Sequence, residues 1–337
     1  MHSEDQIKAL FDKFQHLNIL IIGDVMIDAY LWGKVERISP EAPVPIVAVN
    51  KKTNRLGGAA NVALNIKALG ANPILCSVIG KDEKAATFEE MLLANGMFAG
   101  GIIKSPDRTT TTKFRIIGNN VQMLRVDEEI DSNLNEHDFE DFMQLLQKLL
   151  SENQIDGIIF QDYDKGVISA ELIDAVVRLA SSKNIPVSVD PKKRNFSSYQ
   201  NLKLFKPNLK ELREGLGFDF DKQDAENLRK AVRKVHEKQN IEIVLATLSE
   251  EGVFISRRKE NQTYEELHLP AHLRAIADVS GAGDTVVSMA ALCLALGLSL
   301  HEIAAFSNLA GGQVCESVGV VPVSREKLMK EMAGLNL

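Results

Sequence analysis

Residues 278–285 read DVSGAGDT and run directly into an apolar stretch that continues to Leu298. Gly281 and Gly283 let the backbone approach an anion closely, and the unpaired N–H groups at a helix start point toward it. The helix dipole adds about half a positive charge at that end. The pattern therefore predicts a helix whose first amides, those of Gly281, Ala282 and Gly283, hold charge that develops on a transferring phosphoryl group.

Asp284 lies in the first turn of this expected helix, next to the anion site, where it can accept a proton from an attacking hydroxyl. A carboxylate at a helix N-terminus is expected to be a weak base. Phosphoryl transfer tolerates this because its transition state is loose and the proton can leave late. The alternative interpretation is a tight turn with a helix cap. A dinucleotide fingerprint would need glycine where Val286 stands, and the GxxxxGK[ST] pattern of a Walker A loop does not occur.

The composition indicates a soluble globular protein, with 45% apolar and 25% charged residues. A net charge of -7 disfavours binding to bulk nucleic acid or to an anionic membrane. The three cysteines are far apart and form neither a zinc motif nor a disulfide framework. The N-terminus lacks the apolar core of a signal peptide, and the run 286–298 is shorter than the ~18 residues of a membrane span. We therefore expect a cytoplasmic protein.

Apolar strands alternate with amphipathic helices along most of the chain, which predicts a three-layer α/β/α fold around a mostly parallel sheet. The expected strands are 19–22, 74–79, 155–160, 186–190 and 241–247, and the expected helices are 4–16, 58–69, 83–95, 136–150, 169–183, 222–238, 282–296, 300–316 and 324–334.

Two extended stretches in the first half, residues 29–50 and 108–127, do not fit this alternation. The second alternates around Gly118-Asn119-Asn120, which predicts a β-hairpin over residues 113–126. We expect both stretches to form a small β-sheet lid over the carboxyl edge of the main sheet, where open α/β folds bind ligands. The interpretation is one domain over residues 1–337.

These features together resemble the ribokinase-like (PfkB) carbohydrate kinase family over nearly the whole chain. Residues 278–285 are similar to its C-terminal signature, in which the aspartate, here Asp284, is the catalytic base and the preceding amides form the anion hole. Residues 57–63, GGAANVA, are similar to its N-terminal signature. That similarity implies that Gly57, Gly58 and Asn61 contact sugar hydroxyls. Without the resemblance, this stretch could be a simple helix entry.

The resemblance also implies a nucleotide site for ATP with Mg²⁺. Asn208 and Glu211 match an Asn-x-x-Glu motif that organises Mg²⁺ and phosphate, largely through water, although the same residues could be a helix cap with a surface glutamate. The remaining positions implied for this site are Thr247, Ser249 and Gly252 in a nucleotide loop, Asn308 in the adenine pocket, and Asp278 with Ser280 at a possible K⁺ site. Ser249 departs from the glycine of many members.

Other segments resemble the subgroup that phosphorylates D-glycero-D-manno-heptose 7-phosphate at the anomeric 1-hydroxyl, an early step toward ADP-heptose and lipopolysaccharide core. These segments are residues 23–28, 37–45, 110–115, 122–127 and 162–167. In bifunctional relatives a nucleotidylyltransferase domain follows the kinase. Because this chain stops at Leu337, we expect a kinase without that second activity.

For the sugar, Asp28 is the predicted hydroxyl ligand, with help from Asp24 and, through the lid, from Glu41. The substrate phosphate needs cations, and the lid supplies Lys113, Arg115 and Arg125 on alternating positions, with Arg37 in its other segment. The alternative is that these are solvated charges on edge strands. Lys165, after a strand, is a candidate for the nucleotide phosphates.

A lid that excludes water would protect ATP from hydrolysis. Its exposed strands predict a homodimer. Two other functions stay open at this point: a pfkB-type kinase for another sugar, sugar phosphate or nucleoside, and, with less support, a non-catalytic sugar or nucleotide sensor. An NAD-dependent oxidoreductase is disfavoured because the dinucleotide fingerprint is missing.

Overall fold

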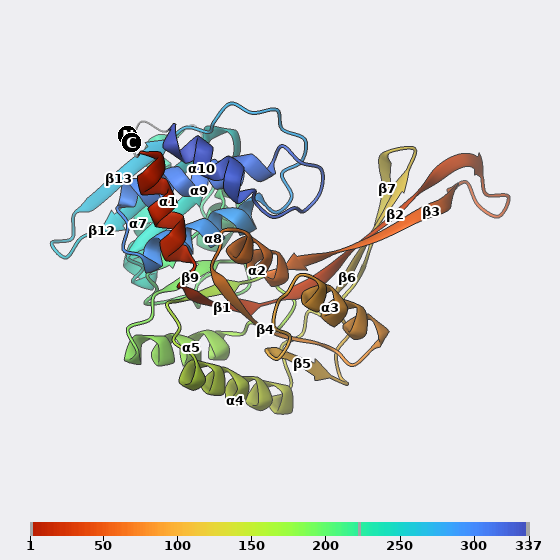
Figure 1. Cartoon of the computed structure of the whole chain (residues 1–337), viewed down its shortest axis with the longest axis horizontal. Helices are drawn as coiled ribbons and strands as arrows, with labels where there is room; N and C mark the ends of the chain where they lie inside the picture. The colour runs from red at the N-terminus through yellow and green to blue at the C-terminus, as the bar shows by residue number, and fades with distance from the viewer. Residues whose placement is uncertain (1–2, 222–223, 335–337) are drawn as a thin grey trace.

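A computed structural model describes residues 3–221 and 224–334 and contains a central sheet of nine strands (Figure 1). The strands are parallel from β5 to β11, and β12 and β13 extend the sheet in the antiparallel sense. In spatial order they are β13 (Tyr264–Leu269), β12 (Val253–Arg258), β11 (Ile243–Thr247), β10 (Leu204–Phe205), β9 (Val187–Asp190), β8 (Gly157–Gln161), β1 (Asn18–Gly23), β4 (Asn72–Gly80) and β5 (Ile102–Ser105).

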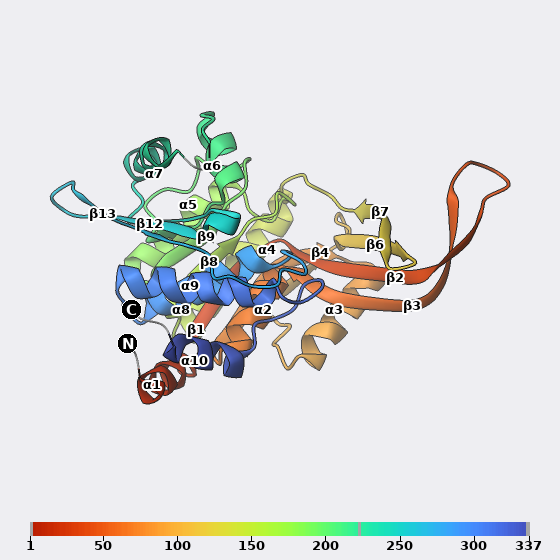
Figure 2. The ribbon, with the colours of Figure 1, turned by 90° about the horizontal axis from the view of Figure 1, so that it is seen from above.

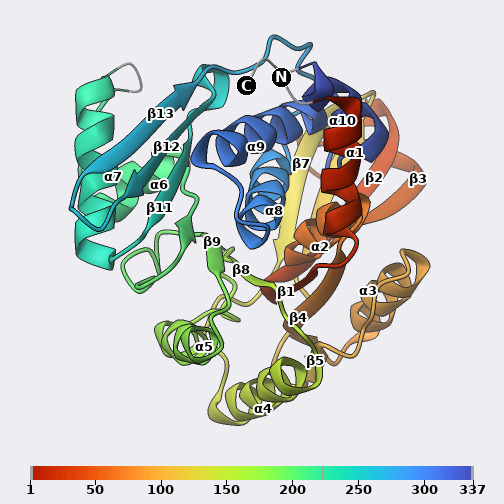
Figure 3. The ribbon, with the colours of Figure 1, turned by 60° about the vertical axis from the view of Figure 1, so that its left-hand side comes forward.

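Both faces of this sheet are covered by helices (Figure 3). Successive residues of β1 show why, since Ile19 and Ile21 are buried in one core while Leu20 and Ile22 are buried in the other. The first core is completed by α1 (Glu4–Phe14), α2 (Ala59–Ala68), α3 (Glu83–Ala94), α8 (Ala282–Ala295), α9 (Leu300–Val314) and α10 (Arg325–Ala333). The second is completed by α4 (Glu136–Glu152), α5 (Ala170–Ser182), α6 (Leu209–Leu216) and α7 (Ala225–Gln239). The three-layer architecture is as predicted.

A second sheet of four strands projects from the body of the protein (Figure 2). Its order is β3 (Pro45–Gly58), β2 (Val25–Ile38), β6 (Thr112–Gly118) and β7 (Val121–Glu128). Asn119 and Asn120 form the β6–β7 turn with φ of 51° and 64°, the left-handed conformation that a tight hairpin requires. We call this sheet the lid sheet below.

The sequence pattern missed four strands of the central sheet. β5 has only four residues and β10 only two, and the antiparallel pair β12–β13 follows β11 where the alternation predicted only helices. The lid strands are also longer than expected, since β2 begins at Val25 and β3 ends at Gly58. The predicted helix 222–238 begins at Ala225, and its residues 222–223 lie outside the described residues.

Within residues 3–221 and 224–334, the structure contains no helix with the length and apolar character needed to cross a membrane.

Candidate active site

The carboxyl ends of the parallel strands meet the start of α8. Gly23, Gln161 and Asp190 end β1, β8 and β9 and are register neighbours across the sheet. Gly281 is the N-cap of α8, with φ of 82°, and no side chain within the described residues caps this helix start. The Ala282 amide donates to the carbonyl of Val279 at 3.3 Å, so among the described residues the Gly281 and Gly283 amides are the ones left open to an anion.

Asp284 lies in the first turn of α8, is 4% exposed, and accepts three side-chain hydrogen bonds. Tyr163 Oη donates to its Oδ1 at 2.9 Å, and Gln161 Nε2 donates to the same oxygen at 3.1 Å. Asn61 Nδ2 donates to Oδ2 at 2.6 Å. The carboxylate is thus held from three directions by groups from different parts of the chain.

Burial raises the pKa of Asp284 to about 6, and the negative charge of Asp190 adds to the shift. The hydrogen bonds from Asn61 and Tyr163 and the charge of Lys206 act in the opposite direction and keep the pKa from rising further. A base with this pKa is mostly ionised at neutral pH and is stronger than an exposed carboxylate. Burial therefore offsets the low basicity that a carboxylate at a helix N-terminus would otherwise have.

Asn61 joins the two sequence signatures. It is fully buried on α2, and its backbone carbonyl accepts a hydrogen bond from Asn65 Nδ2 at 2.9 Å. Asn65 Oδ1 in turn accepts from the Thr285 hydroxyl at 3.1 Å. The sequence predicted that Asn61 contacts sugar, whereas in this structure its amide is engaged with the base.

A buried ion pair lies beneath the predicted anion hole. Lys206 Nζ is 2.9 Å from Asp190 Oδ2, and the two side chains are 2% and 5% exposed. A Cβ added to Gly283 would lie 3.1 Å from the Lys206 ammonium and 3.4 Å from Asp190 Oδ2. Glycine at position 283 therefore lets the first turn of α8 lie directly against this ion pair.

Lys192 is a second cation at this edge. Its ammonium pairs with Glu211 and lies 5.5 Å from the centre of the Tyr163 ring. Although burial acts against it, the charges of Asp190 and Glu211 raise the pKa of Lys192, so this side chain stays cationic.

The predicted sugar ligand Asp28 is 2% exposed on β2 and pairs with Arg115 on the neighbouring strand β6. Gly57 packs directly against it, since a Cβ at this position would lie 2.4 Å from Asp28 Oδ2. Gly58 has φ of 61° and approaches the backbone of Asp24 closely. The structure thus brings together Asp28, Arg115 and the glycine pair.

The prediction that Asp24 helps to bind sugar finds no support in this geometry. Asp24 is 1% exposed, and its carboxylate accepts backbone N–H groups of Tyr163, Lys165 and Val167 at 2.9 to 3.1 Å. The amides of the loop after β8 occupy the Asp24 oxygens, and Asp24 thereby holds this loop in place.

The lid cations are paired with carboxylates. Lys113 Nζ lies 3.0 Å from Asp127 and 3.1 Å from Glu129, and Lys165 lies 2.7 Å from the other oxygen of Glu129. Although partial burial acts against it, the hydrogen bonds from Lys165 and Lys113 lower the pKa of Glu129. Arg125 pairs with Asp127 at 2.9 Å and is 53% exposed. Lys165, predicted at the nucleotide, thus shares a carboxylate with a lid lysine.

Asn208 and Glu211 form a reciprocal cap at the start of α6. Asn208 Oδ1 accepts the Glu211 amide, and Glu211 Oε2 accepts the Asn208 amide, both at 2.8 Å. Glu211 is 6% exposed and is not the surface glutamate of the alternative interpretation. A parallel bridge joins Asn208 to Thr247, so these two predicted nucleotide positions are adjacent.

The remaining nucleotide positions follow β11 or lie on α9. Ser249 has φ of 54°, in the left-handed region that favours glycine. Gly252 has φ of 86°, and a Cβ there would lie 2.1 Å from the carbonyl of Leu269. Asn308 Nδ2 donates to the carbonyl of Pro270 at 2.8 Å, so its amide holds the segment after β13.

Asp278 orders the loop before α8. Its Oδ1 accepts the amide and hydroxyl of Ser280 at 3.0 and 2.8 Å, and its Oδ2 accepts the Gly319 amide at 2.8 Å. Although partial burial acts against it, these hydrogen bonds lower the pKa of Asp278 and keep it ionised. The predicted K⁺ residues thus fix the shape of the loop that leads to Gly281.

Glu41, predicted to reach a sugar hydroxyl as the lid closes, lies away from the other site residues in this structure. It is exposed in the 39–44 connection at the outer tip of the β2–β3 hairpin, as is Arg37 near the end of β2 (Figures 1 and 2). Each of these strands has 14 residues, which corresponds to a reach of about 45 Å. The tip therefore lies far from Asp284 of the same chain.

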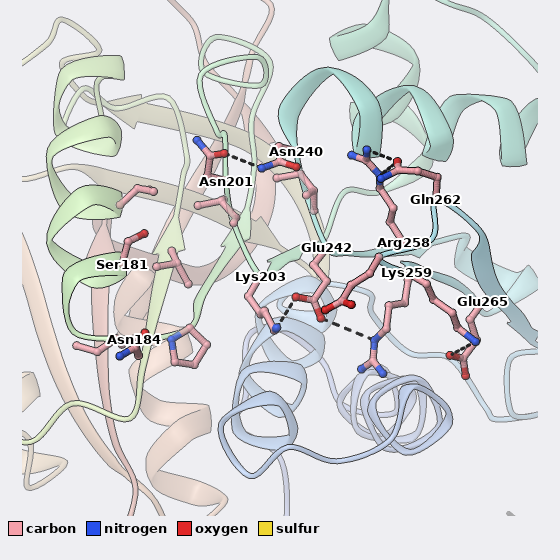
Figure 4. A pocket seen from close by; sticks show the side chains of 18 of the residues that line it. Ser181, Asn184, Asn201, Lys203, Asn240, Glu242, Arg258, Lys259, Gln262 and Glu265 are labelled. Carbon is pink, nitrogen blue, oxygen red and sulfur yellow. Dashed lines mark hydrogen bonds and ion pairs between the residues drawn. The ribbon is translucent and has the colours of Figure 1, made fainter.

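A cavity of about 1150 Å³ lies at the opposite edge of the sheet, near the amino ends of β9, β10 and β11 (Figure 4). Its charged side chains pair with one another, as in Lys203 with Glu242 and Lys259 with Glu265. It contains none of the predicted site residues.

Sequence reasoning gave no role to several polar residues at the carboxyl edge of the sheet: Glu129, Gln161, Tyr163, Asp190, Lys192 and Lys206. A usable signal was present for three of them, since Asp190-Pro191-Lys192 and Lys206-Pro207 directly follow buried strands. Charged residues at that place in a parallel sheet tend to meet at the ligand crevice.

Comparison with known proteins adds an independent result. A profile of the family described as pfkB family carbohydrate kinase matches residues 16–327. The bifunctional protein HldE of Helicobacter pylori strain J99 is 38% identical over 310 residues, which cover 92% of this chain and 65% of that protein. HldE of Syntrophotalea carbinolica is 37% identical over 327 residues, covering 97% of this chain and 65% of the relative. The chain thus spans about 65% of the length of these curated relatives.

Solved structures share the fold at lower identity. Phosphofructokinase-2 from Escherichia coli in complex with potassium superposes with a TM-score of 0.76 at 19% identity, covering 94% of this chain and 98% of that one. Arabidopsis thaliana ribokinase complexed with ribose and ATP superposes with a TM-score of 0.68 at 16% identity, covering 93% and 98%. The expected ribokinase-like fold is confirmed.

Proposed function

This chain belongs to the pfkB family of carbohydrate kinases, and from that premise we propose that it transfers the γ-phosphoryl group of ATP to the anomeric 1-hydroxyl of D-glycero-D-manno-heptose 7-phosphate. The product would be heptose 1,7-bisphosphate, a precursor for ADP-heptose and lipopolysaccharide core. The observation that carries the kinase mechanism is the placement of Asp284 beside the uncapped N-terminus of α8.

In the proposed reaction the sugar O1 forms a bond to the γ-phosphorus while the bond from that phosphorus to the β–γ bridging oxygen breaks. The hydroxyl proton moves to Asp284, and ADP leaves with the bridging oxygen. The amides of Gly281, Ala282 and Gly283 hold the charge of the transferring group.

For Mg²⁺, the residues present fit a cation bound largely through water. Asn208 and Glu211 are tied to each other's amides, and Glu211 is also paired with Lys192. Oδ1 of Asp190 is buried without a partner among the described residues, which leaves an oxygen acceptor for a hydrated ion. The bound ion would neutralise charge on the ATP phosphates. A K⁺ ion near Asp278 and Ser280 would act only on the shape of the anion hole.

The cations near Asp28 support a phosphorylated sugar as the acceptor. Arg115 lies on Asp28, while Lys113 and Lys165 converge on Glu129 at 3.1 and 2.7 Å. We propose that the 7-phosphate takes the place of Glu129 between the two lysines, and that Asp28 binds sugar hydroxyls. The choice of a heptose rests on the resemblance of residues 23–28, 37–45 and 162–167 to the heptose kinase subgroup, and the 37–38% identity to HldE proteins is consistent with it.

We also propose a homodimer formed through the lid sheet. Its strands and the β2–β3 connection expose apolar side chains that a monomer leaves in water, among them Ile38, Val44, Val121, Met123, Leu124 and Val126. A second copy would cover them.

Product analysis tests the proposed function. The purified chain is incubated with Mg-ATP and heptose 7-phosphate, and in parallel with fructose 6-phosphate, ribose and adenosine, and the products are identified by mass and phosphorus NMR. The expected product carries a new phosphate on the anomeric carbon of the heptose. Faster turnover of ribose or adenosine than of heptose 7-phosphate would overturn the substrate, and no transfer to any acceptor would overturn the kinase function.

A further inference from the structure

The two oxygens of the Asp284 carboxylate are not equivalent. Oδ1 accepts the Tyr163 hydroxyl at 2.9 Å and Gln161 Nε2 at 3.1 Å, whereas Oδ2 accepts only Asn61 Nδ2, at 2.6 Å, from residues 3–221 and 224–334. A carboxylate oxygen has two lone pairs in its plane. Two donors therefore fill Oδ1, and one lone pair of Oδ2 is left for a proton.

Tyr163 is itself fixed in place. Its backbone amide donates to Asp24 Oδ2 at 2.9 Å, in the loop after β8 that Asp24 also ties down at Lys165 and Val167. The ammonium of Lys192 lies 5.5 Å from the ring centre. The hydroxyl is thus delivered to Asp284 by a loop with little freedom to move.

We propose that Tyr163, together with Gln161, is a positioning residue that saturates Oδ1 of Asp284 and leaves Oδ2 as the oxygen that takes the proton from the sugar hydroxyl. The inference deepens the proposed function and rests on it. It also gives a purpose to placing the carboxyl ends of β8 and β1 close to α8, because β8 supplies the Gln161 amide and the Tyr163 loop, and Asp24 after β1 holds that loop.

Tyr163 stays a donor throughout the relevant pH range. Partial burial and the negative charges of Asp284 and Asp190 raise the pKa of Tyr163 well above its usual value. The charged groups that face Asp284 from neighbouring elements are Asp190 on β9, Lys206 after β10 and Lys192 after β9. None of these is altered by removing the Tyr163 hydroxyl, so the effect of that change on the base can be isolated.

The test is the pH dependence of kcat in Tyr163→Phe, measured from pH 5 to 9 with the acceptor that the wild type phosphorylates fastest. A donor to a carboxylate favours its ionised form, so losing the hydroxyl should move the acid limb to higher pH by about one unit. The plateau kcat should fall about tenfold, while KM for ATP and for the sugar stay within about twofold. Substrate ionisation is the same for both enzymes and cancels in the difference.

Tyr199→Phe is the matched control. The Tyr199 hydroxyl also donates to a buried carboxylate, Asp162 Oδ2 at 2.7 Å, but does not contact Asp284. We expect it to lower stability without moving the acid limb. If Tyr163→Phe does not fold, Gln161→Met removes the other donor to Oδ1 and should shift the limb in the same direction.

An acid limb that coincides with that of the wild type in a folded, active Tyr163→Phe enzyme would overturn the inference, as would an equal shift in Tyr199→Phe. A wild type that phosphorylates no acceptor would instead contradict the proposed function. The two failures are therefore distinguishable.

Discussion

The side-chain amide of Asn61 donates a 2.6 Å hydrogen bond to Oδ2 of Asp284, across 223 residues of sequence. This hydrogen bond joins α2, which carries the signature of residues 57–63, to the first turn of α8, which carries the signature of residues 278–285. The two helices pack against each other. The oxygen to which Asn61 donates is the one we assign to the proton. Asn61 thus lies where it can orient the base and meet the attacking hydroxyl.

We predict that kcat falls at acid pH with a midpoint near pH 6. Burial raises the pKa of Asp284 to about 6, and only the ionised form can accept a proton. Activity is therefore full above this pKa and decreases about tenfold per pH unit below it. The measurement is kcat at saturating ATP and sugar, since kcat reports groups in the enzyme–substrate complex.

The variant Asn61→Asp tests whether Asp284 controls the fall of kcat at acid pH (the acid limb). The test is needed because burial also raises the pKa of Asp162 to about 6, so either carboxylate could produce this limb. The variant replaces a donor with a carboxylate of the same size beside the base. Two carboxylates at this distance cannot both ionise easily, so the limb should move up by more than one unit and activity at pH 7 should fall at least tenfold. A limb left in place would mean that another group controls it.

Gly281→Ala should impair both folding and turnover. The residue has φ of 82°, and a Cβ would lie 3.0 Å from Asn61 Nδ2. Left-handed backbone costs a non-glycine residue about 1–2 kcal/mol, and the contact would push Asn61 away from Asp284. We expect a lower melting temperature and a kcat reduced at least tenfold.

Gly297→Ala provides the control for backbone strain alone. Its φ is 68°, it lies just past the other end of α8, and nothing is within 4 Å of an added Cβ. It should lose similar stability and keep its kcat. Equal kcat losses in the two variants would show that the contact with Asn61 is unimportant.

The fold was predictable because it rests on local patterns. Apolar strands alternate with helices whose caps are visible in the sequence, such as Ser169 before α5 and Ser299 before α9. The β12–β13 hairpin was missed because the apolar run of β12, Val253 to Ile255, has only three residues, and β13 carries Glu265, Glu266 and His268 without such a run.

The site was predictable only in part. Glycines at a helix start and a following aspartate announce an anion site through backbone chemistry, and Asp284 is where that argument put it. Partners that meet through the tertiary fold carry no local signal. Nothing near Glu129 indicates that it lies between two lysines, and nothing near Glu41 indicates that two 14-residue strands carry it away from the base.

Lys113→Met should raise KM for the sugar phosphate about tenfold or more and leave KM for ATP within about twofold. The Lys113 side chain is only 12% exposed, so its charge acts at close range on a phosphate that replaces Glu129. Arg125→Met is the control, because that side chain is 53% exposed and screened by water, and its KM should change less than about threefold. An unchanged KM in Lys113→Met would assign the lid cations to lid stability alone.

Leu124→Asp should convert a dimer into a monomer. Leu124 is 55% exposed on β7, the edge strand of the lid sheet, where Val121, Met123 and Val126 are also at least 43% exposed. A charge buried in the proposed interface would cost far more than it does in water, because it would have no partner there. Leu93→Asp, at a 63% exposed position on α3 outside the lid, is the matched control.

Light scattering after gel filtration should give twice the chain mass for the wild type and Leu93→Asp, and the single chain mass for Leu124→Asp. A wild type that already elutes with the mass of one chain would refute the dimer, and a Leu124→Asp variant that keeps the double mass would place the interface on another surface.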